Sequence, residues 1–158
     1  TGNFMADSSP GGGEHLKLLT RLKNWKGGTE EPNHLILVSF STLGMTEEEV
    51  IERGIPYESG IARFRETSRG HIMGLDRGLL KMLFSLKTRR LLGCHIVGEG
   101  ATELIHIGQA VLNLKGTLDY FVENTFNYPT LAEAYKIAAL DAWNRMGAGV
   151  PVAQVKDA

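Results

Sequence analysis

The sequence predicts an α+β domain in which an antiparallel sheet of four to five strands packs against helices. After about residue 34, the first half of the chain holds short apolar runs rich in branched and aromatic residues. Short turn-like connections join these runs, and they allow only antiparallel neighbours. The second half repeats its apolar residues at helical spacing instead. Strands first and helices afterwards are typical of an α+β domain.

The composition is that of an ordinary soluble globular protein. Of the 158 residues, 42% are hydrophobic and 22% are charged, and a chain of this length can bury its own core as one domain. The net charge of −1 gives no indication of nucleic acid or a membrane surface as a partner. The chain has a single cysteine, no apolar run near the ~20 residues that span a bilayer, and no hydrophobic signal core. These features predict a cytoplasmic protein.

The two ends of the chain differ from its middle. Stretches rich in Gly, Ser and Pro flank residues 14–25, which can form one short helix, although an isolated helix of ~12 residues is marginal. We therefore expect residues 1–33 to be a flexible tail or a non-native leader, with a docked helix as the alternative. The globular domain should occupy residues 34–146, and residues 147–158 should form a flexible C-terminal tail.

The domain should begin with a strand and a short helix. Residues 35–40 have the branched and aromatic content of a strand. Thr46 can then cap a helix, with Glu49 completing a capping box, and Gly54 should end it.

Three or four more strands should follow, and the candidate apolar runs are Tyr57 to Phe64, His71 to Leu75, Leu80 to Leu86 and Leu91 to Val97. Turn residues separate them at Arg69-Gly70, Asp76-Arg77-Gly78 and Lys87-Thr88-Arg89-Arg90.

Three helices should follow. Residues 101–115 form one long amphipathic pattern, residues 118–122 a shorter one, and residues 131–146 an alanine-rich helix that permits close packing. Helices 101–115 and 131–146, together with the sheet face, could supply an apolar interface between two subunits, and a large charged residue at Ala138 should then disrupt it.

Three patterns in this part suggest chemistry only weakly. Residues 98–103 begin like a dinucleotide-binding loop, but Glu103 replaces the third glycine, so a turn with an acidic first helical turn is favoured. Glu103 and His106 could supply two ligands of a metal, but a stable site needs three or four, so a solvated stripe is favoured and no metal site is predicted. Cys94 lies within an apolar strand, which favours a buried, inert thiol over a nucleophile.

The segment 125–135 carries the strongest signal. Locally, Tyr128 before Pro129 should be extended, Thr130 can cap the last helix and Glu133 can complete a second capping box. A purely structural interpretation of this segment is therefore open.

A resemblance favours a functional interpretation. Asn127-Tyr128-Pro129-Thr130-Leu131-Ala132-Glu133 resembles the end of the pyridine nucleotide-disulfide oxidoreductases, where a His-Pro-Thr segment precedes a catalytic Glu. Gly44-Met45-Thr46-Glu47-Glu48 resembles the Gly-x-Thr-Glu signature at the start of that family's C-terminal domain. Tyr128 replaces the usual His, and with this departure the segment is similar to the soluble pyridine nucleotide transhydrogenases. The resemblance covers roughly residues 38–146.

The resemblance implies a dimerisation domain of the kind found in FAD- and NAD-linked reductases, from a flavoprotein that moves hydride between NADPH and NAD without a redox disulfide. Tyr128 and Glu133 occupy the family's catalytic positions, and Tyr128, Pro129 and Thr130 should lie near the flavin of the partner subunit. A tyrosine phenol, with an ordinary pKa near ~10, is a poor proton shuttle, but hydride transfer needs none. FAD and NAD(P) would belong to the full-length enzyme, so this chain alone should bind no cofactor and be inactive.

Three hypotheses therefore remain. The first is the interface domain of a homodimeric transhydrogenase, partnered by the FAD- and NAD-binding portion of the enzyme, with no nucleic acid and no membrane. The second is a free-standing homodimeric interaction module without catalysis. The third, an autonomous enzyme using Glu103, His106 or Tyr128, has the least support because no complete set of catalytic groups is present.

Overall fold

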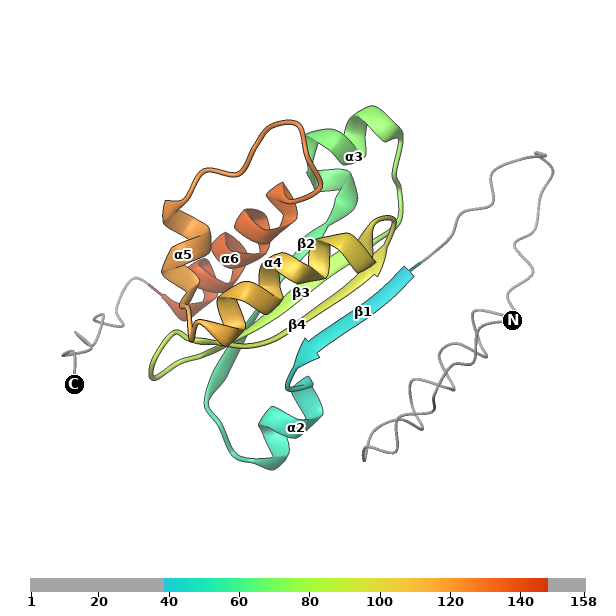
Figure 1. Cartoon of the computed structure of the whole chain (residues 1–158). Coiled ribbons are helices and arrows are strands. Elements are labelled where there is room, and N and C mark those ends of the chain that lie inside the picture. Colours follow the sequence, from blue (N-terminus) through green and yellow to red (C-terminus); the bar gives the residue numbers. More distant parts are fainter. Residues whose placement is uncertain (1–38, 148–158) are drawn as a thin grey trace, which may run out of the picture. The chain divides into compact units, whose positions relative to one another are not determined.

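The structure is a computed structural model that describes residues 39–147. The predicted tails at residues 1–33 and 147–158, with the possible helix at 14–25, lie outside the described residues, apart from Gly147. Within 39–147, four strands form one antiparallel sheet in the order β1-β4-β3-β2, with helices on one face (Figure 1). The predicted α+β class with an antiparallel sheet is confirmed.

The strands are β1 (Ser39–Gly44), β2 (Tyr57–Arg63), β3 (Leu79–Ser85) and β4 (Leu91–Gly98). The helices are α2 (Glu47–Glu52), α3 (Ser68–Met73), α4 (Ala101–Asn113), α5 (Leu118–Glu123) and α6 (Glu133–Met146), with a 3-10 turn η1 (Phe64–Glu66). No helix within these residues is long and apolar enough to cross a membrane.

Most predicted elements are confirmed to within two residues at each end. The first strand is an exception, because β1 runs from Ser39 to Gly44 and overlaps the predicted 35–40 only at its start; residues 35–38 are not described. The capping box at α2 forms as predicted, with Thr46 and Glu49 bonded through both backbone and side chain.

The predicted strand from His71 to Leu75 is wrong, because the chain forms α3 (Ser68–Met73) there. The Thr67 side chain caps this helix by accepting a hydrogen bond from the Gly70 amide at 3.0 Å, and Gly74 ends it in the left-handed conformation, at φ 65°. Gly70 is therefore a helical residue and not part of a turn. A six-residue helix is too short to show a clear helical period in its apolar residues.

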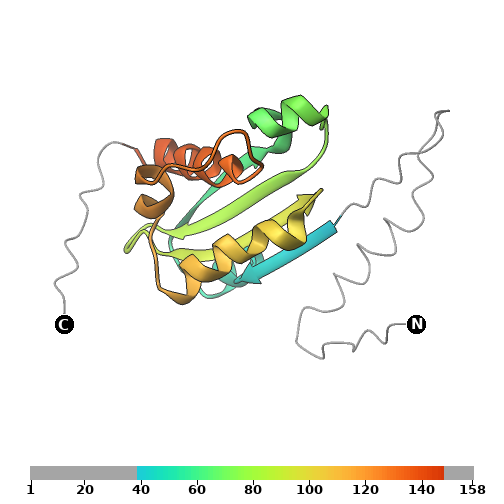
Figure 2. The same ribbon diagram turned by 45° about the horizontal axis from the view of Figure 1, so that its top comes forward.

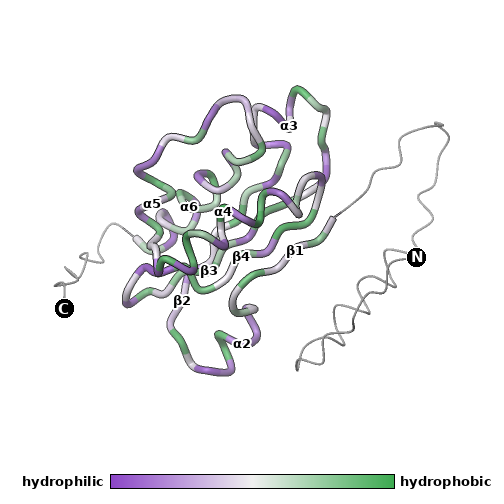
Figure 3. Tube along the Cα trace, in the orientation of Figure 1, coloured by the Kyte–Doolittle hydropathy of each residue, from purple (hydrophilic) through white to green (hydrophobic). Residues whose placement is uncertain are grey.

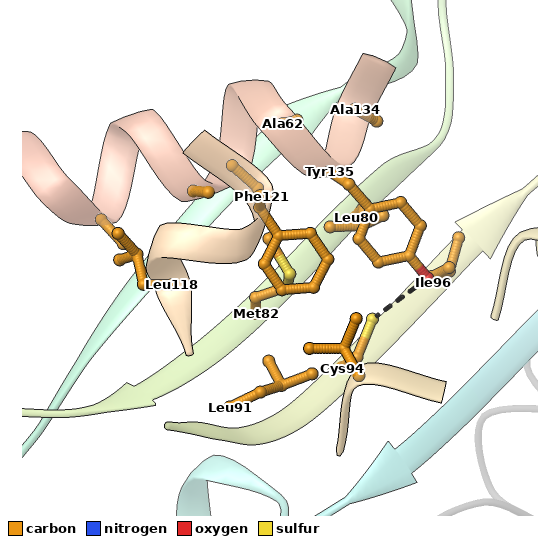
Figure 4. Packing of buried hydrophobic residues seen from close by; sticks show 14 of the residues in the cluster. Ala62, Leu80, Met82, Leu91, Cys94, Ile96, Leu118, Phe121, Ala134 and Tyr135 are labelled. Carbon is orange, nitrogen blue, oxygen red and sulfur yellow. Dashed lines mark hydrogen bonds between the residues drawn. The ribbon is translucent and has the colours of Figure 1, made fainter. Parts of the chain in front are cut away.

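Three helices cover the inner face of the sheet. Helix α4 packs on β1 and β4, α6 packs on β2 and β3, and α5 packs on α6 (Figure 2). Hydrophobic and hydrophilic stretches alternate along α4 (Figure 3), as expected of a helix with one side on a sheet. The core between the layers includes Leu80, Met82, Ile96, Phe121 and Tyr135, all fully buried (Figure 4).

The alanines of α6 face the sheet and not another subunit. Ala134, Ala138 and Ala142 are fully buried, and a methyl group added at Gly60 of β2 would overlap the carbonyl oxygen of Ala138. The prediction that Ala138 tests a dimer interface is therefore wrong: a large charged residue there would disrupt the core. The outward side of α6 instead exposes Leu140 and Trp143.

The outward side of α4 carries several polar residues. Its exposed residues include Glu103, His106, Gln109 and Asn113. Ala110 on the same helix is also exposed, and Leu104, Ile105 and Ile107 are half-buried, so the predicted subunit interface on this helix stays a prediction.

Candidate functional site

The candidate site is the loop that joins α5 to α6, residues 124–132, which passes close to α3 at one end of the sheet (Figure 1). Tyr128 lies in this loop with 75% of its surface exposed, and Pro129 beside it is also exposed. The peptide bond between them is cis. Tyr128 therefore does not pack in the core of its own domain, and its phenol is available to another molecule.

Glu133, the first residue of α6, holds this loop through two side-chain hydrogen bonds. Its Oε2 accepts a hydrogen bond from the backbone amide of Thr130 at 3.2 Å. Its Oε1 accepts one from the hydroxyl of Ser68, the first residue of α3, at 3.4 Å. One carboxylate thus ties the exposed loop both to the helix that follows it and to a helix 65 residues earlier in the chain.

Only one of the two hydrogen bonds of the second predicted capping box forms. The Glu133 side chain accepts from Thr130 as predicted, but the Thr130 hydroxyl donates to the carbonyl oxygen of Asn127 at 2.6 Å. Helix α6 begins at Glu133, two residues later than predicted, and its N-cap is Ala132, which makes no side-chain cap. Thr130 is therefore a loop-stabilising residue and not the helix cap.

Several groups that hold the loop were not evident from any pattern in the sequence. Ser68 reaches Glu133 only through the fold. The Lys136 ammonium donates to the carbonyl oxygen of Asn124 at 3.1 Å and so fixes the start of the loop. Phe126 stacks on Tyr135 of α6, with ring centroids 6.3 Å apart, which anchors the loop to the core.

The turn before α4 has a structural explanation. Gly98 and Gly100 have φ values of 137° and 68°, and a side chain at Gly98 would collide with the ring of Phe64. The two glycines are thus explained by backbone conformation and close packing. This agrees with the favoured interpretation as a turn that opens into α4.

The other candidate residues do not join the loop. His106 Nδ1 lies 3.0 Å from the side-chain oxygen of Gln109 on the same helix. Among residues 39–147, no group of three or more His, Cys, Asp or Glu could hold a metal ion. Cys94 is fully buried, and burial raises the pKa of its thiol to about 12, against a smaller opposing effect of the Tyr135 hydroxyl. The thiol is therefore protonated and inert at neutral pH.

Comparison with known families matches this fold to a defined domain. Residues 36–139 match the model of the pyridine nucleotide-disulphide oxidoreductase dimerisation domain. The chain belongs to this family. A dimerisation domain implies self-association, and the Tyr128 loop and both signature segments, 44–48 and 127–133, lie within the match.

Relatives of this dimerisation domain point to one branch of the family. This chain is 51% identical over 109 residues to a soluble pyridine nucleotide transhydrogenase of Yersinia pestis (strain Pestoides F). The same identity holds for a protein of that name from Yersinia pseudotuberculosis serotype O:1b (strain IP 31758). The match covers 67% of this chain and 23% of each relative, so the chain spans about a quarter of the length of these proteins.

Solved structures agree on the fold. The HOCl-induced flavoprotein disulfide reductase RclA from Escherichia coli aligns with a TM-score of 0.61 at 20% identity, over 80% of this chain and 31% of that one. LpdA from Mycobacterium tuberculosis aligns with a TM-score of 0.60 at 18% identity, over 64% of this chain and 22% of that one.

Proposed function

We propose that this chain supplies the C-terminal dimerisation domain of a homodimeric, FAD-dependent soluble pyridine nucleotide transhydrogenase in the cytoplasm. The whole enzyme would transfer hydride reversibly between NADPH and NAD. The observation that carries the proposal is the 51% identity over 109 residues to proteins of that name, which greatly exceeds the 20% identity to a structural relative that is a disulfide reductase.

The Tyr128 loop fits a place at the flavin of the partner subunit. Tyr128 presents a largely exposed aromatic ring, which can cover an apolar ring system and exclude water from it. Thr130 and Glu133 hold the backbone of the loop without using the Tyr128 hydroxyl. When bound, FAD would supply the hydride acceptor and donor, while this chain's residues shape one wall of the site.

The exchange of His for Tyr128 agrees with this chemistry. A histidine at this position can shuttle protons to and from a thiol near neutral pH, whereas a tyrosine phenol cannot. Hydride transfer through a flavin consumes no such proton. Glu133, which in the wider family orients the His, instead binds the Thr130 amide and Ser68 here.

A chimeric enzyme tests the proposal. In the Yersinia pestis relative, the matched 109-residue segment is replaced by the corresponding segment of this chain. We expect a dimer by light scattering that retains FAD and transfers hydride from NADPH to an NAD analogue, within about tenfold of the parent rate. A chimera that folds and dimerises but transfers no hydride would contradict the proposal and favour the free-standing interaction module.

Two tyrosine variants of the chimera locate the flavin contact. Tyr128→Ala should weaken FAD retention or lower kcat at least about tenfold, because it removes the wall of the site. Tyr120→Ala is the matched control: Tyr120 is also exposed, at 45%, but lies on α5 outside the loop, and its loss should change kcat less than twofold. Equal effects of the two variants would contradict the placement of Tyr128.

A further inference from the structure

The hydroxyl of Tyr135 forms hydrogen bonds with the backbone of a neighbouring helix, α4. Tyr135 belongs to the first turn of α6, yet its hydroxyl donates to the carbonyl oxygen of Leu104 at 2.7 Å and accepts from the amide of Gly108 at 3.1 Å. These two groups of α4 are four residues apart, so they are the natural partners of one helical hydrogen bond. The Tyr135 hydroxyl thus bonds to both members of one such pair.

This hydroxyl has no hydrogen-bonding capacity left. A phenol has one donor and two lone pairs, and the second lone pair accepts from the thiol of Cys94 at a distance of 3.7 Å, marked in Figure 4. Tyr135 and Cys94 are both fully buried, and burial raises the pKa of the Tyr135 phenol. The group is therefore a neutral, fully satisfied bridge between α6, α4 and β4.

Gly108 supplies independent support for a specific bridge. Glycine weakens the interior of a helix relative to alanine, so its presence in the middle of α4 needs a reason. A Cβ at this position would lie only 3.2 Å from both the Tyr135 oxygen and the Cys94 sulfur. Gly108 thus leaves the space that lets the phenol reach the helix backbone.

The ring that carries this hydroxyl also contacts the candidate site. It stacks on Phe121 of α5 at 5.4 Å, and on Phe126 of the loop at 6.3 Å, each with an interplanar angle of 9°. Phe126 is two residues before Tyr128 in the chain. One side chain therefore joins the sheet, three helices and the exposed loop.

We infer that Tyr135 is a positioning residue for the Tyr128–Pro129–Thr130 loop: its hydroxyl fixes the place of the ring against α4, and the ring fixes the loop through Phe126. The consequence for hydride transfer at the flavin rests on the proposed function. The effect of Tyr135 on the position of the loop does not rest on it, because the contacts of Tyr135 with Phe126 and α4 lie within this domain.

Hydrogen exchange on the 158-residue chain tests the role in the loop. Tyr135→Phe keeps the ring and removes the hydroxyl. We expect exchange of the Thr130 amide, which Glu133 protects, to become at least tenfold faster relative to the amides of β3. Tyr120→Phe is the control, because Tyr120 also contacts the Phe121 ring, at 5.3 Å, but lies outside the loop; it should leave that ratio within twofold. An unchanged ratio in Tyr135→Phe would overturn the inference and leave the hydroxyl a role in overall stability alone.

A second variant keeps the test decisive if Tyr135→Phe does not fold. Phe126→Leu retains every hydrogen bond of Tyr135 and removes only the ring that links it to the loop. It should also accelerate exchange at Thr130 at least tenfold relative to β3, and an unchanged ratio would overturn the inference.

The chimeric enzyme separates this inference from the proposed function. There, Tyr135→Phe should lower kcat about tenfold with KM for NADPH within twofold, because the loop and not the nucleotide site is displaced. If the parent chimera transfers no hydride, the proposed function fails while the exchange result stands. If the parent is active and Tyr135→Phe matches it, the link from Tyr135 to the reaction is overturned.

Discussion

Two segments of this domain carry the same Thr-x-x-Glu pattern and use it differently. At Thr46 and Glu49 both hydrogen bonds of a capping box form. The Thr46 amide donates to the Glu49 carboxylate at 2.8 Å, and the Glu49 amide donates to the Thr46 hydroxyl at 3.2 Å. At Thr130 and Glu133 only the carboxylate bond forms. The Thr130 hydroxyl bonds instead to Asn127, and Glu133 also binds Ser68.

The packing of the two helices explains this difference. Helix α2 has six residues, of which only Val50 is buried, so its start depends on the local cap. Helix α6 has fourteen residues and a buried face that includes Ala134, Ala138 and Ala142, so contacts with the sheet fix its position. A helix that tertiary packing holds in place does not need its capping residues, and here those residues hold an exposed loop.

The largest expected effect concerns the contact that holds α6. Gly60→Ala forces a methyl group against the backbone of Ala138, and such overpacking should lower the free energy of unfolding by about 3 kcal/mol. Urea denaturation measures it.

Gly54→Ala is the matched control at the end of α2. Nothing lies within 4 Å of a Cβ at Gly54, but its φ is +61°, so only backbone strain of about 1 kcal/mol is expected. If the two variants lost equal stability, tertiary packing would not distinguish the two helices.

A smaller effect should separate the two threonines. Thr46→Ala removes a formed cap and should lower the free energy of unfolding by about 1 kcal/mol. Thr130→Ala removes a bond within an exposed loop and should lower it by less than half as much. A larger loss from Thr130→Ala in the same urea titrations would contradict its assignment as a loop residue.

The smallest effect is a pH dependence at the α2 end. His95 bonds to the carbonyl oxygen of Met45 at 3.2 Å, and burial lowers its pKa, although that bond opposes the shift. Since the unfolded chain then binds the proton more readily, stability should fall as pH drops below about 6.5. His95→Gln should flatten this slope between pH 7 and 5, by less than the effect of Thr46→Ala.

Glu47 sets a separate and lower pH range. The hydrogen bond from Lys81 is the main cause that lowers its pKa from 4.5, so the stability it contributes is present above that value and is lost as pH falls below it. For the range between pH 7 and 5, an unchanged slope of stability against pH in His95→Gln would show that a group other than His95 titrates there.

The sequence predicted the elements whose signals are local. The capping box at Thr46, the turn after β3 and the amphipathic pattern of α4 depend on neighbouring residues, and all three are confirmed. The helix α3 was missed because its caps, Thr67 and Gly74, flank only six residues.

The sequence indicated which residues belong to the candidate loop but not which contacts hold it. The local pattern predicted a loop at Tyr128 and Pro129 followed by a helix, and the structure has both, with Tyr128 exposed. That these residues and Glu133 form a functional site stays a prediction. Among the contacts that hold that loop, Ser68 bonds to Glu133 from 65 residues away, and the Tyr135 ring stacks on Phe126 while its hydroxyl bonds to the backbone of α4. No pattern along the chain reports contacts between residues so far apart.

The most direct test of the account compares the two glutamates in the chimeric enzyme. Glu133→Ala should lower hydride transfer per bound FAD at least about tenfold, because it releases the Tyr128 loop from both Thr130 and Ser68. Glu49→Ala, the same change in the intact capping box, should leave that rate within twofold. If Glu133→Ala retained the full rate, or if both variants lost it equally, Glu133 would be a helix cap like Glu49 and the loop would have no part in the reaction.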